Sequence, residues 1–162
     1  MKTDYEALIN QFYGSFNDLD SRGMSRCYHQ SLTFEDPAFG EMNHYDTCMM
    51  WQMLCESQKG KEFEVTHRDL KVNGEEATVT WEAHYFFRTG RKVHNVINAS
   101  FKFQDGLIVD HRDRFNLYKW SRMALGMQGL LVGWTPFFKS GLEKQTRRML
   151  EKYKAKNQLK AH

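Results

Sequence analysis

The sequence predicts an α+β fold in which helices come first and an antiparallel sheet follows. The first 58 residues carry apolar side chains at helical spacing, with one short interruption. The second half of the chain instead alternates apolar and polar residues between regularly placed glycine turns. A run of helices followed by a run of strands is typical of α+β folds.

Three helices and one short strand are expected in the first 58 residues. Apolar residues of the first helix recur every three or four positions: Tyr5, Leu8, Ile9, Phe12, Tyr13 and Phe16. A second helix, at 22–29, follows the start signal Asp20-Ser21. Residues 32–37 are predicted to form a short strand that ends at a proline, and residues 45–57 a third helix.

The sheet is predicted from three dipeptides that favour tight hairpins. They recur sixteen residues apart: Asn73-Gly74, Thr89-Gly90 and Asp105-Gly106. Asn-Gly and Asp-Gly favour type I′ turns, in which both central residues have positive φ. The segments between them are rich in Val, Thr, Ile and aromatic residues, so we expect a four-stranded meander with strands at 62–72, 76–88, 92–104 and 107–118.

Alternation within these strands predicts which side chains point inward. Ala77, Val79 and Trp81 share one face of the second strand, and Tyr85 continues it. On the last strand the predicted inward face holds Leu107, Val109, His111, Asp113, Phe115 and Leu117. The apolar faces of the third and last strands therefore contain three polar residues that need an explanation: Asn95, His111 and Asp113.

The end of the chain has a different character from the rest. Residues 120–138 are apolar and interrupted by glycines, and residues 139–162 form a basic helical tail with eight basic and two acidic residues. We therefore divide the chain into a domain at 1–118 and a segment at 119–162 that packs on the same domain. Three interpretations of 120–138 stay open: it covers an open end of the domain or extends a dimer contact, it is a mobile lid, or with the tail it is an anchor at a membrane surface.

Composition and charge restrict the class of protein. The tail carries +6 and the remaining residues −3, so the net charge of +3 does not indicate a nucleic-acid-binding core. Cys27, Cys48 and Cys55 form no C-x-x-C pair, which favours free thiols over a disulfide framework or structural zinc. The first ten residues contain no apolar run typical of a secretion signal, and no uncharged run is long enough to span a membrane. We expect a cytoplasmic protein.

The order of these elements, with Phe34-Glu35-Asp36-Pro37-Ala38-Phe39-Gly40 at the end of the first strand, resembles the nuclear transport factor 2-like superfamily. Within it the chain is most similar to SnoaL-like and ketosteroid-isomerase-like bacterial proteins, which residues 106–115 also resemble. The resemblance covers residues 4–117. It implies a cystatin-like cone, in which a curved sheet wraps round a long helix and leaves an apolar pocket at one end. It also implies a homodimer.

The same resemblance places Asp36 at the position of the general base of ketosteroid isomerases, enzymes in which the surroundings of a carboxyl group tune its pKa. A carboxylate beside an apolar pocket is partly desolvated, and this raises its pKa enough to accept a proton from carbon. The alternative is that Asp36 only organises the turn before Pro37. The residues at the positions of the isomerases' two oxyanion donors are Phe12 and Ala99, and neither can donate a hydrogen bond.

His111 and Asp113 are two residues apart on one strand and are therefore expected on the same face. They occupy a strand whose polar residues act as acid and base in SnoaL-like cyclases, so we expect them to be catalytic together with Asp36. The alternative is a buried polar pair in which each satisfies the other. The expected lining of the pocket is Phe12, Phe16, Trp51, His67, Trp81, Tyr85, Asn95, Ala99 and Phe115.

Two hypotheses about function follow. The first is a cofactor-free isomerase, cyclase or hydrolase that acts on a hydrophobic or polycyclic substrate by general acid/base catalysis. The second is a ligand-binding or protein-interaction module of the same fold without catalysis. No metal or cofactor is expected, because zinc-ligand, dinucleotide and P-loop motifs are missing from the sequence.

Overall fold

The computed structural model describes residues 4–160 and confirms the predicted α+β fold. Helices and strands follow one another in this order: α1 (Tyr5–Asn17), α2 (Ser21–Ser25), β1 (Tyr28–Asp36), β2 (Gly40–Asn43), α3 (His44–Gln58), β3 (Glu64–Asn73), β4 (Glu76–Phe86), β5 (Lys92–Gln104), β6 (Leu107–Arg114), α4 (Leu117–Leu125), α5 (Met127–Val132) and α6 (Pro136–Lys160).

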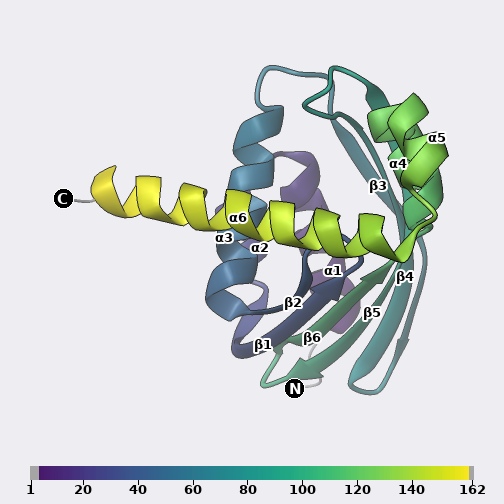
Figure 1. Ribbon diagram of the computed structural model, residues 1–162. Helices are drawn as coiled ribbons and strands as arrows, with labels where there is room; N and C mark the ends of the chain where they lie inside the picture. Colours follow the sequence, from purple (N-terminus) through teal and green to yellow (C-terminus); the bar gives the residue numbers. More distant parts are fainter. Residues whose placement is uncertain (1–3, 161–162) are drawn as a thin grey trace.

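The strands form one curved sheet in the order β2-β1-β6-β5-β4-β3 (Figure 1). The meander β3 to β6 is antiparallel throughout, while β1 pairs with β6 in parallel. Strand β2, which pairs with β1 after a tight turn, was not predicted from the sequence, and β1 is longer than the predicted strand at 32–37. Tyr28, predicted to lie in the second helix at 22–29, is instead the first residue of β1, because that strand continues alongside β6 as far as Ile108.

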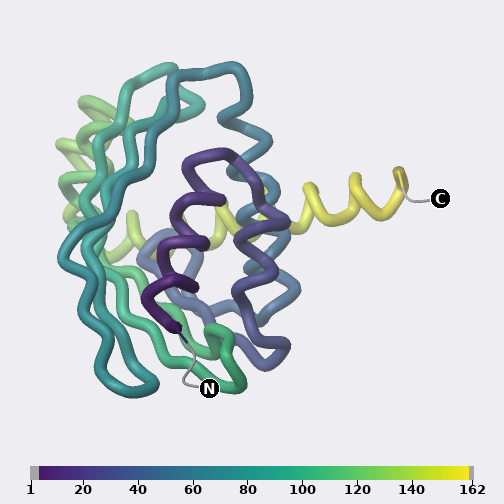
Figure 2. Tube along the Cα trace, turned by 180° about the vertical axis from the view of Figure 1, so that it is seen from behind, coloured from purple at the N-terminus to yellow at the C-terminus, as the bar shows by residue number. Residues whose placement is uncertain are grey.

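The three N-terminal helices lie on the concave face of the sheet, and α1 lies innermost (Figure 2). Asp4 begins α1 by accepting a hydrogen bond from the backbone N–H of Ala7 at 2.9 Å, which satisfies one of the free amides of the first turn. The apolar face of α1 is buried in the core through Ile9, Phe12, Tyr13 and Phe16. The cone predicted from the family resemblance is therefore confirmed, with α1 as the helix that the sheet wraps.

A bulge in the last hairpin changes the predicted inward face of β6. Phe103 pairs with Ile108, but Lys102 pairs with Asp110, so β6 holds one extra residue between these pairs. Ile108 is consequently buried, whereas the predicted Val109 is not. His111 and Asp113, beyond the bulge, do point inward.

The hairpin turns follow the glycines, with one correction. In the β5–β6 turn both Asp105 and Gly106 have positive φ, 53° and 81°, as a type I′ turn requires. In the β3–β4 turn only Gly74 does, because Asn73 still pairs with Glu76 and belongs to β3. The central residues of that turn are therefore Gly74 and Glu75, and the type I′ prediction is wrong there.

The chain leaves the sheet earlier than predicted. Asn116 accepts a hydrogen bond from the backbone N–H of Lys119 at 2.9 Å and so begins α4 two residues after β6 ends. Helix α4 packs on β5 and buries Trp120 and Ala124 in a second apolar cluster with Val93 and Leu142. Helix α6 crosses the molecule and continues beyond α3 (Figure 1). None of the helices within residues 4–160 has the length and apolar character needed to cross a membrane.

Candidate functional site

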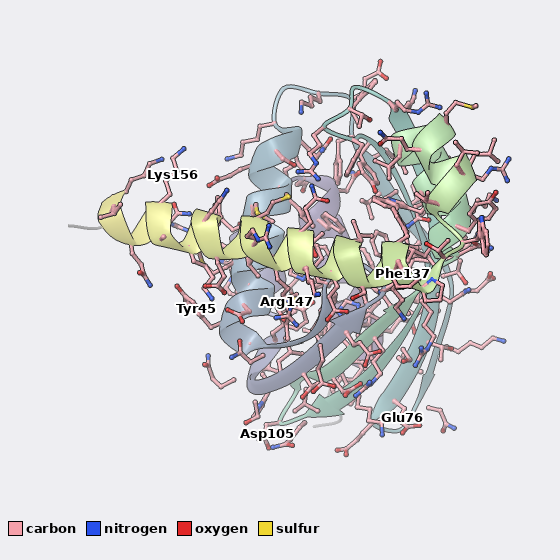
Figure 3. All side chains as sticks on the ribbon, viewed as in Figure 1. Tyr45, Glu76, Asp105, Phe137, Arg147 and Lys156 are labelled. Atoms are coloured by element: carbon pink, nitrogen blue, oxygen red, sulfur yellow. The ribbon has the colours of Figure 1, made fainter. Side chains whose placement is uncertain are left out.

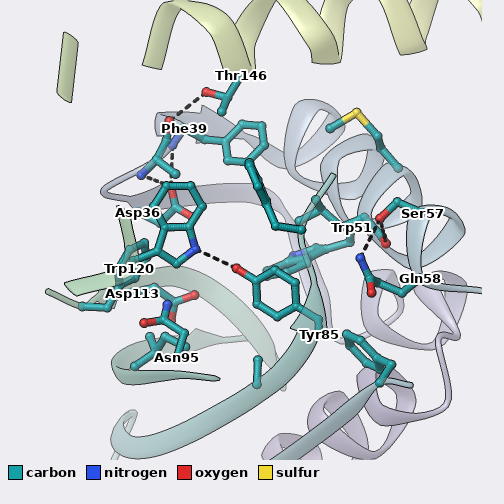
Figure 4. Close-up of a pocket in the computed structure, with 18 of the residues that line it drawn as sticks. Asp36, Phe39, Trp51, Ser57, Gln58, Tyr85, Asn95, Asp113, Trp120 and Thr146 are labelled. Carbon is teal, nitrogen blue, oxygen red and sulfur yellow. Dashed lines mark hydrogen bonds between the residues drawn. The ribbon is translucent and has the colours of Figure 1, made fainter. Parts of the chain in front are cut away.

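A cavity of about 290 Å³ lies between the concave face of the sheet, α3 and α6 (Figure 4). This volume is at the lower end of the range for small-molecule sites. Aromatic rings make up much of its wall: Phe16, Trp51, Trp81, Tyr85, Phe115 and Trp120. Polar groups in the wall include two carboxyls, Asp36 and Asp113, together with Asn95 and Gln58. The site is thus an apolar chamber with a small number of polar groups.

Asp36 lies at the end of β1, where the chain turns into β2. Its Oδ1 accepts hydrogen bonds from the backbone N–H groups of Ala38 and Phe39, at 3.0 and 2.6 Å. It therefore organises the turn, as the alternative interpretation expected. None of the hydrogen bonds found among the described residues uses its other oxygen, Oδ2.

Burial raises the pKa of Asp36, the negative charge of Asp113 adds to the increase, and the resulting value is about 7. The backbone N–H groups of Phe39 and Ala38 and the charge of Arg147 lower the pKa, but they do not offset burial. Near neutral pH the carboxyl therefore exists in both protonated and ionised forms. This is the condition under which a group can take up and release protons.

Asp113 is held by two donors from other elements. Its Oδ1 accepts hydrogen bonds from Trp81 Nε1 at 3.2 Å and from His111 Nε2 at 3.0 Å. Only 3% of its side chain is exposed. A carboxylate needs such partners when it is removed from water, because an unpaired buried charge is strongly unfavourable.

The hydrogen-bond chain continues from His111 into the core. Tyr28 Oη lies 2.8 Å from His111 Nδ1 and also accepts a hydrogen bond from Trp51 Nε1 at 2.9 Å. One arrangement of protons satisfies every member: Trp51 donates to Tyr28, Tyr28 donates to His111, and a neutral His111 donates to Asp113. These residues join α3, β1 and β6, so the chain also ties the helices to the sheet.

A SnoaL-like domain model matches residues 9–111. The chain belongs to the SnoaL-like family. A search of curated protein sequences gave no match.

Solved structures of low sequence identity share the fold of this SnoaL-like chain. An LEH-like epoxide hydrolase of M. tuberculosis is 18% identical, with a TM-score of 0.61, and the match covers 77% of this chain and 90% of the other. A putative polyketide cyclase of Xanthomonas campestris pv. campestris is 17% identical, with a TM-score of 0.59 and coverages of 71% and 92%. A protein of Catenulispora acidiphila with a ketosteroid isomerase-like fold, in complex with trimethylamine, is 14% identical, with a TM-score of 0.64 and coverages of 80% and 97%.

Most of the residues expected at the site of this SnoaL-like chain line the cavity. They are Asp36, Asp113, Phe16, Trp51, Trp81, Tyr85, Asn95 and Phe115. His111 is not among the lining residues. It lies behind Asp113, where its ring packs against Phe12, Phe34 and Phe101 and is 1% exposed.

Three expected lining residues lie elsewhere. Phe12 is a core residue of α1 whose ring contacts Trp51 and Phe101. His67 is stacked on Tyr13 and bonded to Asn10, both of α1. Ala99 is buried in β5, directly opposite Asp113 in the sheet. Helix α1 covers the part of the concave face where these residues lie, so the cavity lies at the other end of the sheet.

Two residues that shape the site were not predicted from the sequence. Trp120 of α4 lines the cavity and donates from Nε1 to the hydroxyl of Tyr85 at 2.7 Å. Tyr28 holds His111 from β1. The large apolar content of 120–138 was the available signal for Trp120, whereas Tyr28 was hidden by the misassigned helix. Within residues 4–160, no group of three His, Cys, Asp or Glu side chains is arranged to hold a metal ion.

Proposed function

We propose that this SnoaL-like protein binds a small hydrophobic molecule with at least one ring and transfers a proton to or from it, with Asp36 as the general acid/base. The observation that carries the proposal is the position of Asp36 in the wall of an aromatic cavity with a pKa of about 7. Flat aromatic walls suit a ring-shaped ligand. The proton carrier is a carboxyl of the chain itself, so the proposed proton transfer needs no cofactor.

Asp113 would act differently from Asp36, although both are aspartates. Its Oδ1 is held by hydrogen bonds from Trp81 and His111, whereas Asp36 is held by backbone N–H groups. Its fixed negative charge favours the protonated form of Asp36 and would also stabilise positive charge that develops on a ligand. Asp36 would therefore carry the transferred proton, while Asp113 supplies charge and a fixed hydrogen-bond acceptor beside it. His111 serves as a positioning residue, since it reaches the cavity only through Asp113.

Among the candidate reactions, hydrolysis or cyclisation fits better than isomerisation through an enolate. An enolate needs hydrogen-bond donors at its oxygen. Phe12 and Ala99, which stand where isomerases of this superfamily have such donors, both lie in the apolar core. The solved structures that share the fold include an epoxide hydrolase and a putative polyketide cyclase, which agrees with this choice.

A non-catalytic binding module is the second candidate. Phe12 and Ala99 favour it, because they leave the cavity without donors for an oxyanion, and such a cavity can still bind an apolar ring. Tyr85 and Asn95 would then orient the ligand by hydrogen bonds, with the Tyr85 hydroxyl already fixed by Trp120.

A panel of cyclic epoxides and fused-ring ketones in deuterated water tests the proposal. Diol formation and deuterium uptake are followed by mass spectrometry for the wild type and for Asp36→Asn. Asparagine keeps a carbonyl oxygen for the Ala38 and Phe39 amides but loses the titrating proton, so we expect turnover to fall by about a hundredfold or more. Glu35→Gln is the matched control, since Glu35 is the adjacent carboxyl and pairs with Arg112 instead of lining the cavity.

Two results would contradict catalysis by Asp36. Equal turnover by the wild type and Asp36→Asn would remove the acid/base role from this residue. Retention of a ring compound in native mass spectra, with no conversion of any member of the panel, would leave the binding module as the function.

A further inference from the structure

The most unusual surface of the molecule lies on α5 and on the turn into α6. Six large apolar side chains are exposed within eleven residues, and we call them the apolar tip: Met127, Leu130, Leu131, Val132, Trp134 and Phe137. Trp134 is 69% exposed and Phe137 is 87% exposed. Single exposed apolar residues are ordinary, but a continuous group of this kind marks an interaction surface.

The apolar tip is held in this orientation by the opposite face of α5. Gly129 and Gly133 lie against Ser121 of α4, so closely that a Cβ on either would overlap it. The hydroxyl of Tyr118 donates to the carbonyl oxygen of Leu130 at 3.2 Å. Small residues therefore face the protein and large apolar residues face the solvent, the reverse of an ordinary surface helix.

The surroundings of the apolar tip carry one sign of charge. Residues 117–142 contain Lys119, Arg122 and Lys139 and no acidic residue. The β4–β5 loop, at 87–91, and the first residue of β5 add three more basic residues, Arg88, Arg91 and Lys92, and no acidic one. This loop is fixed beside α4, because Arg91 Nε donates to Met123 O at 2.9 Å and Thr89 Oγ1 to Ala124 O at 2.6 Å.

Two features keep this positive charge from being neutralised locally. The first acidic residue after the segment, Glu143, is turned toward Gly40. Of the six basic residues, only Lys92 has an acidic partner among the described residues, Glu62 at 3.5 Å. Arg88 is directed toward Met149 of α6, so the rim of the apolar tip is cationic through Arg91, Lys119, Arg122 and Lys139.

We propose that the apolar tip docks this protein on the surface of a membrane that contains anionic lipids. Trp and Phe are suited to the boundary between lipid chains and water, and basic residues beside them bind anionic headgroups. Each apolar side chain that enters the lipid gains the free energy of leaving water. Contact is limited to the surface, with the short helix α5 and the start of α6 lying in the interface.

A second copy of the chain fits this surface less well. In a two-fold contact each residue of the patch meets the same patch of its partner, so the cationic rims would face each other. The repulsion would oppose the apolar contact. An anionic surface instead complements both the rim and the tip.

Vesicle co-sedimentation of the full chain tests the proposal. The probes are vesicles of phosphatidylcholine with phosphatidylglycerol, and vesicles of phosphatidylcholine alone. We expect the wild type to bind the anionic vesicles more tightly, and Trp134→Ala or Phe137→Ala to weaken that binding by about tenfold each. Leu159→Ala is the matched control, because Leu159 is 80% exposed but lies in the last turn of α6. Figure 3 shows Phe137 and Lys156 toward opposite ends of that helix.

The tryptophans give an independent reading of the same contact. Trp51, Trp81 and Trp120 are all buried, so Trp134 is the one that a vesicle would shield from water. We expect its emission to shift to shorter wavelength with anionic vesicles, and the shift to be lost in Trp134→Phe. Circular dichroism of each variant confirms that it is folded.

Three results would overturn the proposal. The first is a wild type that binds neither kind of vesicle. The second is binding that Trp134→Ala and Phe137→Ala leave unchanged, or that Leu159→Ala weakens equally. The third is a wild-type dimer that Trp134→Ala converts to a monomer without vesicles, since a second copy would then cover the apolar tip.

Discussion

The wall of the cavity and the apolar tip break opposite rules of residue placement. The cavity wall places Asp36 and Asp113 among aromatic rings, while the apolar tip places Trp134 and Phe137 in water. The interior exception is compensated within the chain, because backbone amides, Trp81 and His111 donate hydrogen bonds to the two carboxyls. The exterior exception has no such compensation within the described residues.

This difference separates two kinds of functional signal. Buried polar groups that are hydrogen-bonded can be explained by stability alone. Their function must therefore be argued from a property that stability does not require, here the raised pKa of Asp36. Exposed apolar groups on a well-packed helix are not explained by folding, since no contact in the chain needs them there. They point more directly to a partner, although they say nothing about chemistry.

The largest expected effect comes from removing the buried hydrogen bonds that His111 makes to Asp113 and Tyr28. His111→Ala would leave Asp113 and Tyr28 each without one hydrogen-bond partner and would open a void among buried rings. We expect the free energy of unfolding to fall by about 3–5 kcal/mol in urea denaturation. His94→Ala, which removes a half-exposed imidazole bonded to Glu82, should change it by about 0.5 kcal/mol or less. A small effect at both positions would show that the buried chain does not stabilise the fold.

The comparison also explains what could be predicted from the sequence. Alternation on β4, β5 and the second half of β6 is local, so it correctly placed Asn95, His111 and Asp113 on the inner face of the sheet. Alternation assigns a side chain to a face but not to a position along the cone. Phe12, His67 and Ala99 were therefore expected at the cavity, although α1 occupies that part of the concave face.

Long-range pairing explains the remaining errors. The start of β1 at Tyr28 depends on β6, eighty residues later, so local helix signals gave the wrong element there. The bulge between Ile108 and Asp110 is a shift in the pairing of β6 with β5, and no local residue pattern indicates it. Trp120 follows the last strand, and only the packing of α4 on β5 brings it to the cavity.

An effect of intermediate size, a pH dependence of the free energy of unfolding, would test the raised pKa of Asp36 in the cavity wall. The folded-state pKa of Asp36 is about 7, above the value of about 3.9 for an unfolded chain. Between these values the folded state binds more protons than the unfolded state, so this group's contribution to stability decreases as the pH rises from about 4 to about 7. Asp36→Asn removes the contribution and should therefore be the more stable protein at alkaline pH.

The measurement is the difference in free energy of unfolding between Asp36→Asn and the wild type at several pH values. We expect it to grow by about 1–3 kcal/mol across the interval, less than the full pKa shift implies, because the side chain is partly open to the cavity. For Glu35→Gln the same difference should be flat in comparison. A difference that stays constant for Asp36→Asn would show that Asp36 keeps an ordinary pKa.

The smallest expected effect concerns the apolar tip and asks whether its orientation is fixed. A Cβ at Gly129 would overlap the carbonyl oxygen of Ser121 and press against the backbone nitrogen of Arg122. Backbone atoms cannot rotate away as a side chain can, so α5 must move from α4, and we expect Gly129→Ala to destabilise the protein by about 1–2 kcal/mol.

Gly141→Ala is the matched control for this variant. It also lies in a helix, but a Cβ there meets nothing within 4 Å, so the better helix propensity of alanine should stabilise the protein by about 0.5–1 kcal/mol. Changes in unfolding temperature of opposite sign for the two variants, with faster amide exchange in α5 for Gly129→Ala alone, would show that contact with α4 holds the tip.

Gly129→Ala keeps all six apolar side chains, so weaker binding to anionic vesicles would mean that their fixed orientation matters as well as their presence. Unchanged amide exchange and vesicle binding in Gly129→Ala would instead show that the tip does not depend on this contact.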